Sequence, residues 1–353
     1  MWATSRSVAR LRLGRSYGTI VVNRFTNVRK AQRATRVDLH QHLWPEPLLA
    51  ALAARKRPPR LHGARGGMRL ELAYEPGGEI RSEYHDPAAR IALLDACEVD
   101  TAVISLSTPI GIEALPQDEA APLLDAYHDG IAEVVAGSGG RLRTFAAACV
   151  AAPDAGAADV RLRLEAGFAG LSLPSEALAS SAGLDHCAPL LETLEQAGRP
   201  LFVHPGPAPW TRPDPADERL PAWWTPLAQY PAWSLRAFAT WRALGAAAYP
   251  RLRVVFAIMA GGAPFLEGRW RTFTGLAGGI DPNVFLDTAS CQRLDLELAL
   301  AAYGAEQVVL GTDVPVIDPA PLLRSLGALG PYVDRAVAER NPARVLNHQG
   351  GVP

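Results

Sequence analysis

The hexapeptide VDLHQH at positions 37–42 decides how the rest of the chain is interpreted. An apolar approach ends there in two histidines, His40 and His42, separated by one residue. On an extended strand, residues two apart point to the same side, so both imidazoles would leave the strand together. Two neutral nitrogen donors on a stiff backbone suit a divalent metal ion, although the pair could also be one buried polar residue and one loop histidine.

Length and composition are those of a globular protein. The 353 residues suffice for one α/β barrel or two smaller domains, with 48% hydrophobic and 20% charged residues. A net charge of -1 gives no reason to expect nucleic acid or a membrane surface as a partner. No apolar run reaches the roughly 18 to 20 residues that cross a bilayer. The four cysteines form no Cys-x-x-Cys pair, which suits a reducing cytoplasm without disulfides.

Residues 1–36 differ from the rest, with nine Lys or Arg and no acidic residue. An Arg- and Ser-rich start without acids resembles a transit peptide. Its apolar patch at 18–22 is too short for a secretory signal, and no small-residue cleavage site follows. We therefore expect a disordered extension, or a start codon placed too far upstream, before a single domain over residues 37–353.

From position 37 onward, short β-branched runs alternate with longer stretches of helical period. Eight strand–helix units in about 300 residues predict a (β/α)8 barrel with a parallel sheet. A Pro-, Gly- and Arg-rich insertion at residues 56–85 interrupts the alternation and is a candidate lid. The expected strands are residues 36–39, 101–106, 143–150, 167–173, 200–204, 253–258, 283–287 and 307–311.

Potential metal ligands occur at the predicted C-terminal ends of the strands, where such barrels carry their functional residues. The first strand ends in His40 and His42, the fifth ends in His204, and the eighth runs into Asp313. Taken singly, His204 fits a core histidine and Asp313 fits a helix cap. Together, three imidazoles and one carboxylate at one mouth predict a site for Zn²⁺ or a similar ion, with a position left for water.

Five motifs follow one another along the chain: DLHQH at 38–42, VHPG at 203–206, NVFLDTA at 283–289, LGTDVP at 310–315 and NPARVL at 341–346. Together they resemble the amidohydrolase superfamily, and above all its amidohydrolase family 2 branch, which is related to aminocarboxymuconate semialdehyde decarboxylase. The resemblance runs in the right order from position 37 to about 346.

The resemblance implies one divalent metal ion, usually zinc, held by four residues. Carried over to this chain, the ligands are His40, His42, His204 and Asp313. Binuclear relatives have a bridging lysine or glutamate at the end of the fourth strand, where this chain reads LSLP at 171–174. We therefore expect one metal ion and not two.

One position departs from the family pattern. Relatives end the sixth strand with a histidine before a Gly-Gly pair, and alignment on the glycines at 261–262 puts Ile258 there. An isoleucine can neither transfer a proton nor stabilise a developing negative charge. Asp313 could act as the general base on its own, or His62 or His85 of the insertion could reach in to help it. Otherwise the site binds a metal or ligand with little turnover.

The loop after the fifth strand is rich in aromatic residues. Trp210, Arg212 and Trp223 are predicted to line the substrate, with Arg212 available to pair a carboxylate. The same tryptophans could instead pack the loop onto the barrel rim or a neighbouring subunit, so the sequence is compatible with a homodimer.

The function expected from these features is that of a cytoplasmic metal-dependent hydrolase. Metal-activated water would attack a C–N or C–O carbonyl of a small amide, cyclic amide or lactone-like substrate, with Asp313 moving protons. The first alternative is a non-oxidative decarboxylase of a small carboxylic acid in the same site. The His-x-His start counts against it, since decarboxylases of aromatic acids often begin with Glu-x-His. The second alternative, prompted by Ile258, is a catalytically weakened barrel that binds a ligand.

Overall fold

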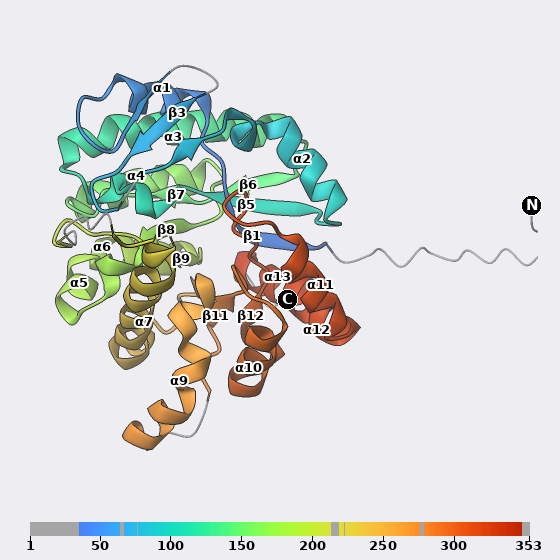
Figure 1. Cartoon of the computed structure of the whole chain (residues 1–353). Coiled ribbons are helices and arrows are strands. Elements are labelled where there is room, and N and C mark those ends of the chain that lie inside the picture. Colours follow the sequence, from blue (N-terminus) through green and yellow to red (C-terminus); the bar gives the residue numbers. More distant parts are fainter. Residues whose placement is uncertain are drawn as a thin grey trace, which may run out of the picture. The chain divides into compact units, whose positions relative to one another are not determined.

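The computed structural model describes residues 35–63, 67–75, 77–212, 219–221, 223–275 and 279–347. The predicted basic extension, residues 1–36, lies outside these ranges except for its last two residues, so the division into extension and barrel domain stays a prediction. Parallel strands surrounded by helices form the predicted (β/α)8 barrel (Figure 1).

The strands follow one another around the barrel in chain order, and the third consists of two short pieces. The last strand meets the first through a hydrogen bond of 2.8 Å from Leu39 N–H to the Leu310 carbonyl and through a parallel bridge between Gln41 and Val314. These contacts close the sheet. The strands are β1 (Val37–His42), β5 (Thr101–Ser105), β6 (Leu142–Thr144) with β7 (Ala146–Ala147), β8 (Leu171–Pro174), β9 (Leu201–His204), β10 (Val254–Phe256), β11 (Val284–Asp287) and β12 (Val308–Val309).

Helices follow the strands and cover the outside of the barrel (Figure 1). They begin where the sequence offers a suitable first turn: the Asp86 carboxylate accepts from Ala88 N–H at 2.8 Å and caps α2. The helices are α1 (Glu46–Ala54), α2 (Pro87–Ala96), α3 (Gln117–Gly137), α4 (Pro153–Glu165), α5 (Ser181–His186), α6 (Ala188–Ala197), α7 (Tyr230–Thr240), α8 (Ala246–Ala248), α9 (Ile258–Thr274), α10 (Arg293–Tyr303), α11 (Ala320–Ala328), α12 (Pro331–Arg335) and α13 (Asn341–Leu346).

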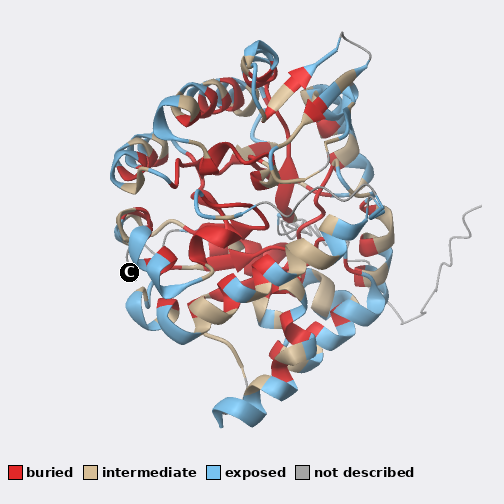
Figure 2. Ribbon diagram, turned by 60° about the vertical axis from the view of Figure 1, so that its left-hand side comes forward, coloured by how far each residue is buried: buried red, intermediate tan, exposed pale blue. Residues whose placement is uncertain are grey.

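The hydrophobic core has two parts. A small cluster that includes Leu39, Phe202 and Phe285 fills the barrel interior, and a larger cluster lies between the strands and the helices. Buried residues accordingly follow the central strands, while the outer faces of the helices are exposed (Figure 2). Each buried side chain of this size stabilises the fold by about 1.5–3 kcal/mol. The core thus supplies a stiff frame for the residues at the strand ends.

A bulge in β1 determines where its histidines point. The register of β1 against β5 shifts between Asp38 and Gln41. Leu39 faces the barrel interior, and the extra residue lets His40 and His42 face it as well. The Asp38 carboxylate fixes the bulge by accepting from His40 N–H at 3.0 Å and from Gln41 Nε2 at 2.7 Å. Strand alternation alone does not produce this geometry.

The insertion at residues 56–85 contains a small antiparallel sheet of β2 (Arg60–His62), β3 (Met68–Glu71) and β4 (Glu79–Ile80). Leu61 and Leu70 are buried and join the main core. The sheet lies beside α1 and α3 in Figure 1. The insertion is therefore packed onto the barrel and contributes to its core.

Two further expectations concern the whole described chain. None of the helices in the described ranges is long and apolar enough to span a membrane. All four cysteines lie among the described residues and carry free thiols, as predicted.

Candidate metal centre

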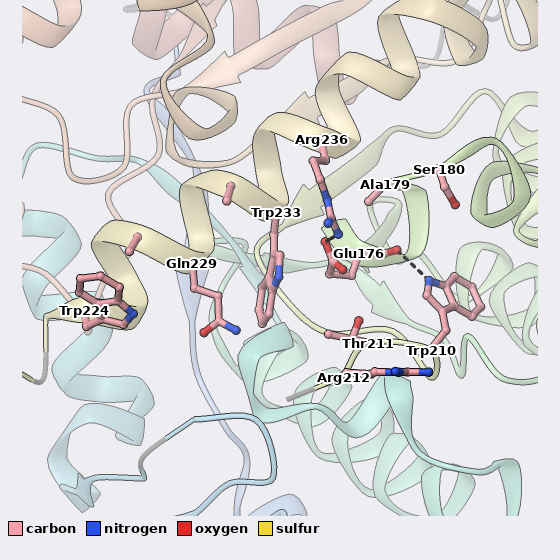
Figure 3. Close-up of a pocket in the computed structure, with 12 residues that line it drawn as sticks. Glu176, Ala179, Ser180, Trp210, Thr211, Arg212, Trp224, Gln229, Trp233 and Arg236 are labelled. Carbon is pink, nitrogen blue, oxygen red and sulfur yellow. Dashed lines mark hydrogen bonds and ion pairs between the residues drawn. The ribbon is translucent and has the colours of Figure 1, made fainter. Parts of the chain in front are cut away.

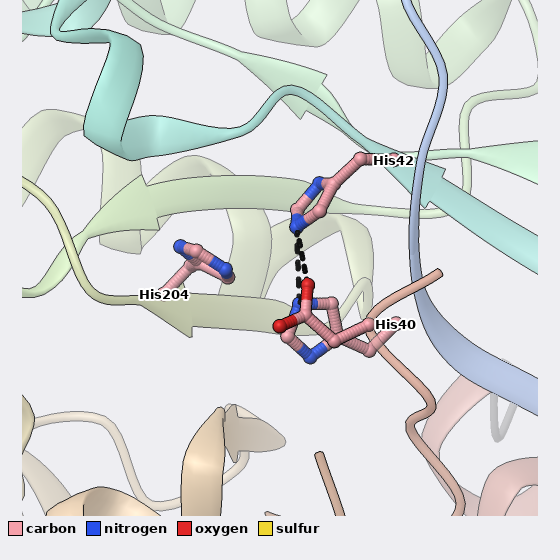
Figure 4. A group of neighbouring side chains, drawn as sticks. His40, His42 and His204 are labelled. Carbon is pink, nitrogen blue, oxygen red and sulfur yellow. Dashed lines mark hydrogen bonds and ion pairs between the residues drawn. The ribbon is translucent and has the colours of Figure 1, made fainter. Parts of the chain in front are cut away.

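Four side chains converge at the C-terminal mouth of the barrel (Figure 4). His40 and His42 come from β1, His204 ends β9, and Asp313 lies just past β12. Each offers one ligand atom, and the four atoms lie within 4.8 Å of one another. All four residues are buried. The structure thus brings together the four residues that the sequence predicted as ligands.

Neighbouring backbone oxygens fix the tautomers of two of the histidines. His42 Nδ1 lies 3.1 Å from the Ser105 carbonyl, and His204 Nδ1 lies 2.9 Å from the Pro205 carbonyl. A carbonyl can only accept, so Nδ1 carries the hydrogen in both rings. Each Nε2 atom therefore directs a lone pair toward the common centre. Thr108 Oγ1 also lies 2.8 Å from His204 Nδ1 and helps to orient this ring.

The third histidine is held by a buried carboxylate. His40 Nδ1 lies 2.7 Å from Asp287 Oδ2 at the end of β11, and Asp287 is fully buried. The other oxygen, Oδ1, accepts from Ile258 N–H at 2.8 Å and Ala289 N–H at 3.0 Å. Asp287 thus orients His40 and connects the sixth strand to the metal centre. Sequence reasoning gave this residue no role, although its position at a strand end was a usable signal.

The space around this pair depends on a glycine. A Cβ on Gly311 would lie 2.8 Å from the Cβ of His40 and 2.9 Å from the Cβ of Asp287. Both distances are shorter than any normal carbon–carbon contact. The glycine of the LGTDVP motif is therefore required for His40 and Asp287 to approach each other.

The four donors fit one divalent cation. His40 Nε2 and His42 Nε2 are 3.2 Å apart, and Asp313 Oδ1 lies 3.4 Å and 3.2 Å from them. This oxygen is buried and accepts no hydrogen bond. Three lone pairs and an anionic oxygen that face one another would repel unless a positive charge lay between them. Three nitrogens and one oxygen are a donor set suited to zinc and to neighbouring divalent transition metals.

The protein's own electrostatics favour a positive charge at this position. Burial opposes protonation of His40, but the carboxylates of Asp287 and Asp313 outweigh it and raise the pKa of His40 to about 9. Burial, with His40 and His42 nearby, lowers the pKa of His204 well below its ordinary value. Burial would raise the pKa of Asp313, yet the three histidines hold it below its usual range. The centre is therefore built to attract one cation.

The sixth strand ends in a left-handed turn with no acid–base group. Residues 258–262 all have positive φ, from 48° at Ile258 to 89° at Gly262. This conformation costs roughly 1–2 kcal/mol per non-glycine residue and is least suited to β-branched side chains. The surroundings impose it: Ile258 is held by Asp287, and a Cβ on Gly261 would lie 2.0 Å from the Pro231 carbonyl oxygen.

The two histidines of the insertion occupy different surroundings. His62 lies on β2, its side chain 47% exposed and 3.8 Å from Glu71, so it does not face the centre. The His85 ring stacks on Trp44, and its Nδ1 accepts from Trp44 N–H at 3.1 Å. Burial, then the nearby charges of Arg90 and His42, lower the pKa of His85 to about 4. Of the two, only His85 lies near the predicted ligands, as a neutral ring.

Two of the three predicted substrate residues lie around a separate cavity. Trp210 and Arg212 line a cavity of about 670 Å³, in which Arg236 pairs with the Glu176 carboxylate (Figure 3). Trp210 Nε1–H donates to the Glu176 carbonyl at 3.3 Å. None of the four metal-centre residues lines this cavity, and Trp223 is 56% exposed and lies outside its lining. The substrate-binding role of Trp210, Arg212 and Trp223 stays a prediction.

A closed barrel with three histidines and an aspartate at its mouth defines the class of metal-dependent (β/α)8 proteins. Within that class, the chain belongs to the amidohydrolase family, whose sequence model matches residues 37–347. The resemblance that the motifs indicated is thereby confirmed. The alignment spans nearly all of the described residues, from β1 to α13.

Known proteins similar to this chain include several decarboxylases. A 2-amino-3-carboxymuconate-6-semialdehyde decarboxylase of Dictyostelium discoideum is 27% identical over 269 residues, 70% of this chain and 73% of the relative. The apo structure of IDCase from Metarhizium anisopliae has a TM-score of 0.73 at 23% identity and covers 88% of this chain and 97% of its own. The structure of 5-carboxyvanillate decarboxylase from Sphingomonas paucimobilis has a TM-score of 0.67 at 20% identity and covers 89% of this chain and 99% of its own. At these identities, the two structures establish the fold.

Proposed function

We propose that this protein is a metal-dependent, non-oxidative decarboxylase of a small aromatic or otherwise unsaturated carboxylic acid. The observation that carries the proposal is the cluster of His40, His42, His204 and Asp313 in an amidohydrolase family member. The decarboxylase names of its similar proteins favour this alternative over the hydrolase that the sequence first suggested.

The chemistry at the sixth strand supports the same choice. Hydrolysis requires a water molecule to be held and deprotonated, which Ile258 cannot do. In decarboxylation the C–C bond to the carboxylate breaks, CO₂ leaves, and the carbon keeps the electron pair until it receives a proton. No attacking water has to be activated. Replacing the histidine by isoleucine therefore removes a group that hydrolysis needs more than decarboxylation does.

Four residues would hold a single divalent ion in this proposal, namely His40, His42, His204 and Asp313. When bound, the ion would supply a Lewis acid that orients substrate oxygens and stabilises negative charge. Zinc was the expected metal, whereas a dihydroxybenzoic acid decarboxylase from Polaromonas sp. JS666, of similar fold, was solved with bound manganese. The proposal is one Zn²⁺ or Mn²⁺ ion per chain.

The residues around the ion have separate tasks. Asp287, Ser105 and Thr108 orient the histidine rings, so the donors are preorganised before an ion binds. Asp313 is kept ionised by the histidines and suits a charge-bearing ligand better than a proton donor. The role of Asp313 as a general base stays a prediction, as do a cytoplasmic location and a homodimer.

A substrate panel tests the proposed function. The purified chain is loaded with Zn²⁺ or Mn²⁺ and incubated with 2,6-dihydroxybenzoate, 5-carboxyvanillate and 2-amino-3-carboxymuconate semialdehyde, and CO₂ release is measured. We expect turnover of at least one acid, with one bound ion per chain. Hydrolysis of lactones or cyclic amides without CO₂ release would instead support the hydrolase. Ligand binding without turnover of any kind would support a binding protein.

A further inference from the structure

A hydrogen-bonded pair joins the insertion to the helix that follows the fifth strand. Tyr230 Oη–H donates to Glu75 Oε2 at 2.6 Å, across 155 positions of sequence. Tyr230 is the first residue of α7, and Glu75 lies between β3 and β4. Both residues are half-buried. This bond joins the insertion to the first turn of α7.

Contacts of the adjacent residue place Glu75 at the barrel mouth. A Cβ on Gly111 would lie 3.3 Å from the Tyr74 ring and 3.6 Å from Pro207. Gly111 belongs to the loop after the second strand, and Pro207 is three residues beyond His204. The segment that carries Glu75 therefore rests where the loops of the second and fifth strands meet, beside one of the proposed ligands.

Contacts of α7 place Tyr230 beside the sixth strand. Gly261, in the left-handed turn after β10, has no room for a Cβ because the Pro231 carbonyl oxygen would lie 2.0 Å away. Pro231 directly follows Tyr230, and the same turn begins with Ile258. The start of α7 thus packs against the turn that begins with Ile258, the position that alignment on the glycines assigns to the histidine of relatives.

The protonation of the pair suits proton transfer. Burial, then the negative charges of Glu75 and Asp313, keep the pKa of Tyr230 well above its ordinary value, so the phenol stays protonated. Burial raises the pKa of Glu75 to about 7, against the opposing effect of the Tyr230 hydrogen bond. Near neutral pH the pair therefore exchanges one proton with solvent. The influence of Asp313 on Tyr230 indicates that the pair lies within electrostatic reach of the metal centre.

We propose that Tyr230 is the proton donor to the substrate carbon and that Glu75 reprotonates it, in place of a sixth-strand histidine. This inference rests on the proposed decarboxylation. A protonated Glu75 donates its O–H to Tyr230 Oη, which frees the phenolic hydrogen to face the substrate. As the C–C bond breaks and CO₂ leaves, the carbon's electron pair takes the phenolic proton. The phenolate then takes the Glu75 proton, and water later returns one to the carboxylate.

In this structure Tyr230 Oη lies within hydrogen-bond distance of the Glu75 carboxylate, so a proton can pass directly between the two groups. The other groups considered from the sequence are less suitable. Ile258 has no proton to give, and His62 points to Glu71. His85 has its Nδ1 engaged as an acceptor by Trp44 N–H, which leaves a neutral ring as a weak acid.

Two variants test the relay, both assayed with the acid that the panel identifies. Tyr230→Phe is expected to lower kcat by about 10²–10⁴-fold with KM changed only a few-fold and metal content unchanged. Tyr332→Phe is the matched control, since it removes a comparable tyrosine–glutamate bond of 3.0 Å, to Glu306, on an exposed surface. A Tyr230→Phe enzyme within threefold of the wild-type kcat would overturn the proposal.

The pH profile distinguishes relay from packing for Glu75. The protonated form is the active one, so kcat of the wild type should fall as pH rises through about 7. Tyr230 is the titratable group in contact with Glu75, and Asp313 is the further charge that acts on Tyr230. Glu75→Gln should lower kcat and abolish this basic limb. A wild-type kcat that stays constant from pH 6 to pH 9 contradicts the relay.

A thermal denaturation series tests the pair without any substrate. Because the folded-state pKa of Glu75 is raised from 4.5 to about 7, the native state binds the proton more tightly, and stability falls as pH rises across that interval. Glu75→Gln lacks this loss, so its Tm relative to wild type should increase from pH 5 to pH 8. An unchanged Tm difference overturns the pair as a proton carrier. If the wild type is inactive on the whole substrate panel, the proposed decarboxylation is rejected. The pH dependence of the Tm difference still tests whether the Tyr230–Glu75 pair carries a proton.

Discussion

The two sides of the barrel mouth differ in how far their residues are prepared for chemistry. On the side of the first, fifth and eighth strands, each imidazole is oriented by a second group, and His40 alone engages a fully buried carboxylate. On the side of the sixth strand, Ile258 occupies a strained left-handed position and offers no polar side-chain atom. The side chains proposed to hold an ion thus lie on one side of the mouth, and residues 258–262 on the other side add no acid–base group.

The two sides are nevertheless connected. Asp287 receives His40 Nδ1 on one oxygen and Ile258 N–H on the other. The turn after the sixth strand therefore supports the candidate metal centre through its backbone. A backbone contribution of this kind does not depend on the side chain at position 258.

The largest effect is expected from removing a proposed ligand. Asp313→Ala should eliminate stoichiometric metal binding and lower kcat by more than about 10³-fold, since a bound ion would contribute several kcal/mol of charge stabilisation. Metal content by mass spectrometry and kcat on the identified acid measure both. Asp318→Ala is the control, an exposed aspartate nearby whose carboxylate accepts from Ala320 N–H at 3.0 Å. Full metal content in Asp313→Ala would refute the donor set.

A smaller effect is expected from the residue that joins the two sides. Asp287→Asn keeps the shape of the side chain but removes the charge that holds His40, and metal affinity should fall about 10–100-fold. The affinity is measured by competition with a chelator. Asp281→Asn is the control, because Asp281 lies before the start of β11, where it accepts from Asn283 N–H at 2.7 Å. Equal affinity of Asp287→Asn and wild type would mean that His40 needs no carboxylate.

The sequence predicted the barrel and the four donors for a specific physical reason. Functional residues of such barrels lie at the strand ends, so positions far apart in the sequence become neighbours in space. His42 and His204 end strands, His40 lies two residues before the end of β1, and Asp313 follows β12. The rule did not distinguish Asp287 from an ordinary capping residue, because its role depends on its contact with the His40 ring, which the sequence does not reveal. It also could not predict the Tyr230–Glu75 bond, which joins a loop to an insertion without periodic pattern.

Alanine substitutions at two glycines compare how tightly the chain is packed at the candidate metal centre and on the outer surface. Gly311→Ala should destabilise the fold by about 1–3 kcal/mol, because the new Cβ overpacks against His40 and Asp287. Gly327→Ala, in an exposed position of α11 with nothing within 4 Å, should stabilise it by about 0.5–1 kcal/mol. Thermal unfolding of the two variants gives both values. A neutral Gly311→Ala would show that the centre tolerates rearrangement.

The smallest effect is expected at the sixth strand itself. Histidine adopts the left-handed conformation more readily than isoleucine, so Ile258→His should fold and relieve strain. If Tyr230 already supplies the proton, the added imidazole should change kcat by less than about tenfold. In a Tyr230→Phe background the same substitution should restore at least about tenfold of the lost activity, because the histidine then has a step to perform. A much larger increase in kcat in the wild-type background would show instead that the site lacks a proton donor, and that the Tyr230–Glu75 pair does not take the place of a sixth-strand histidine.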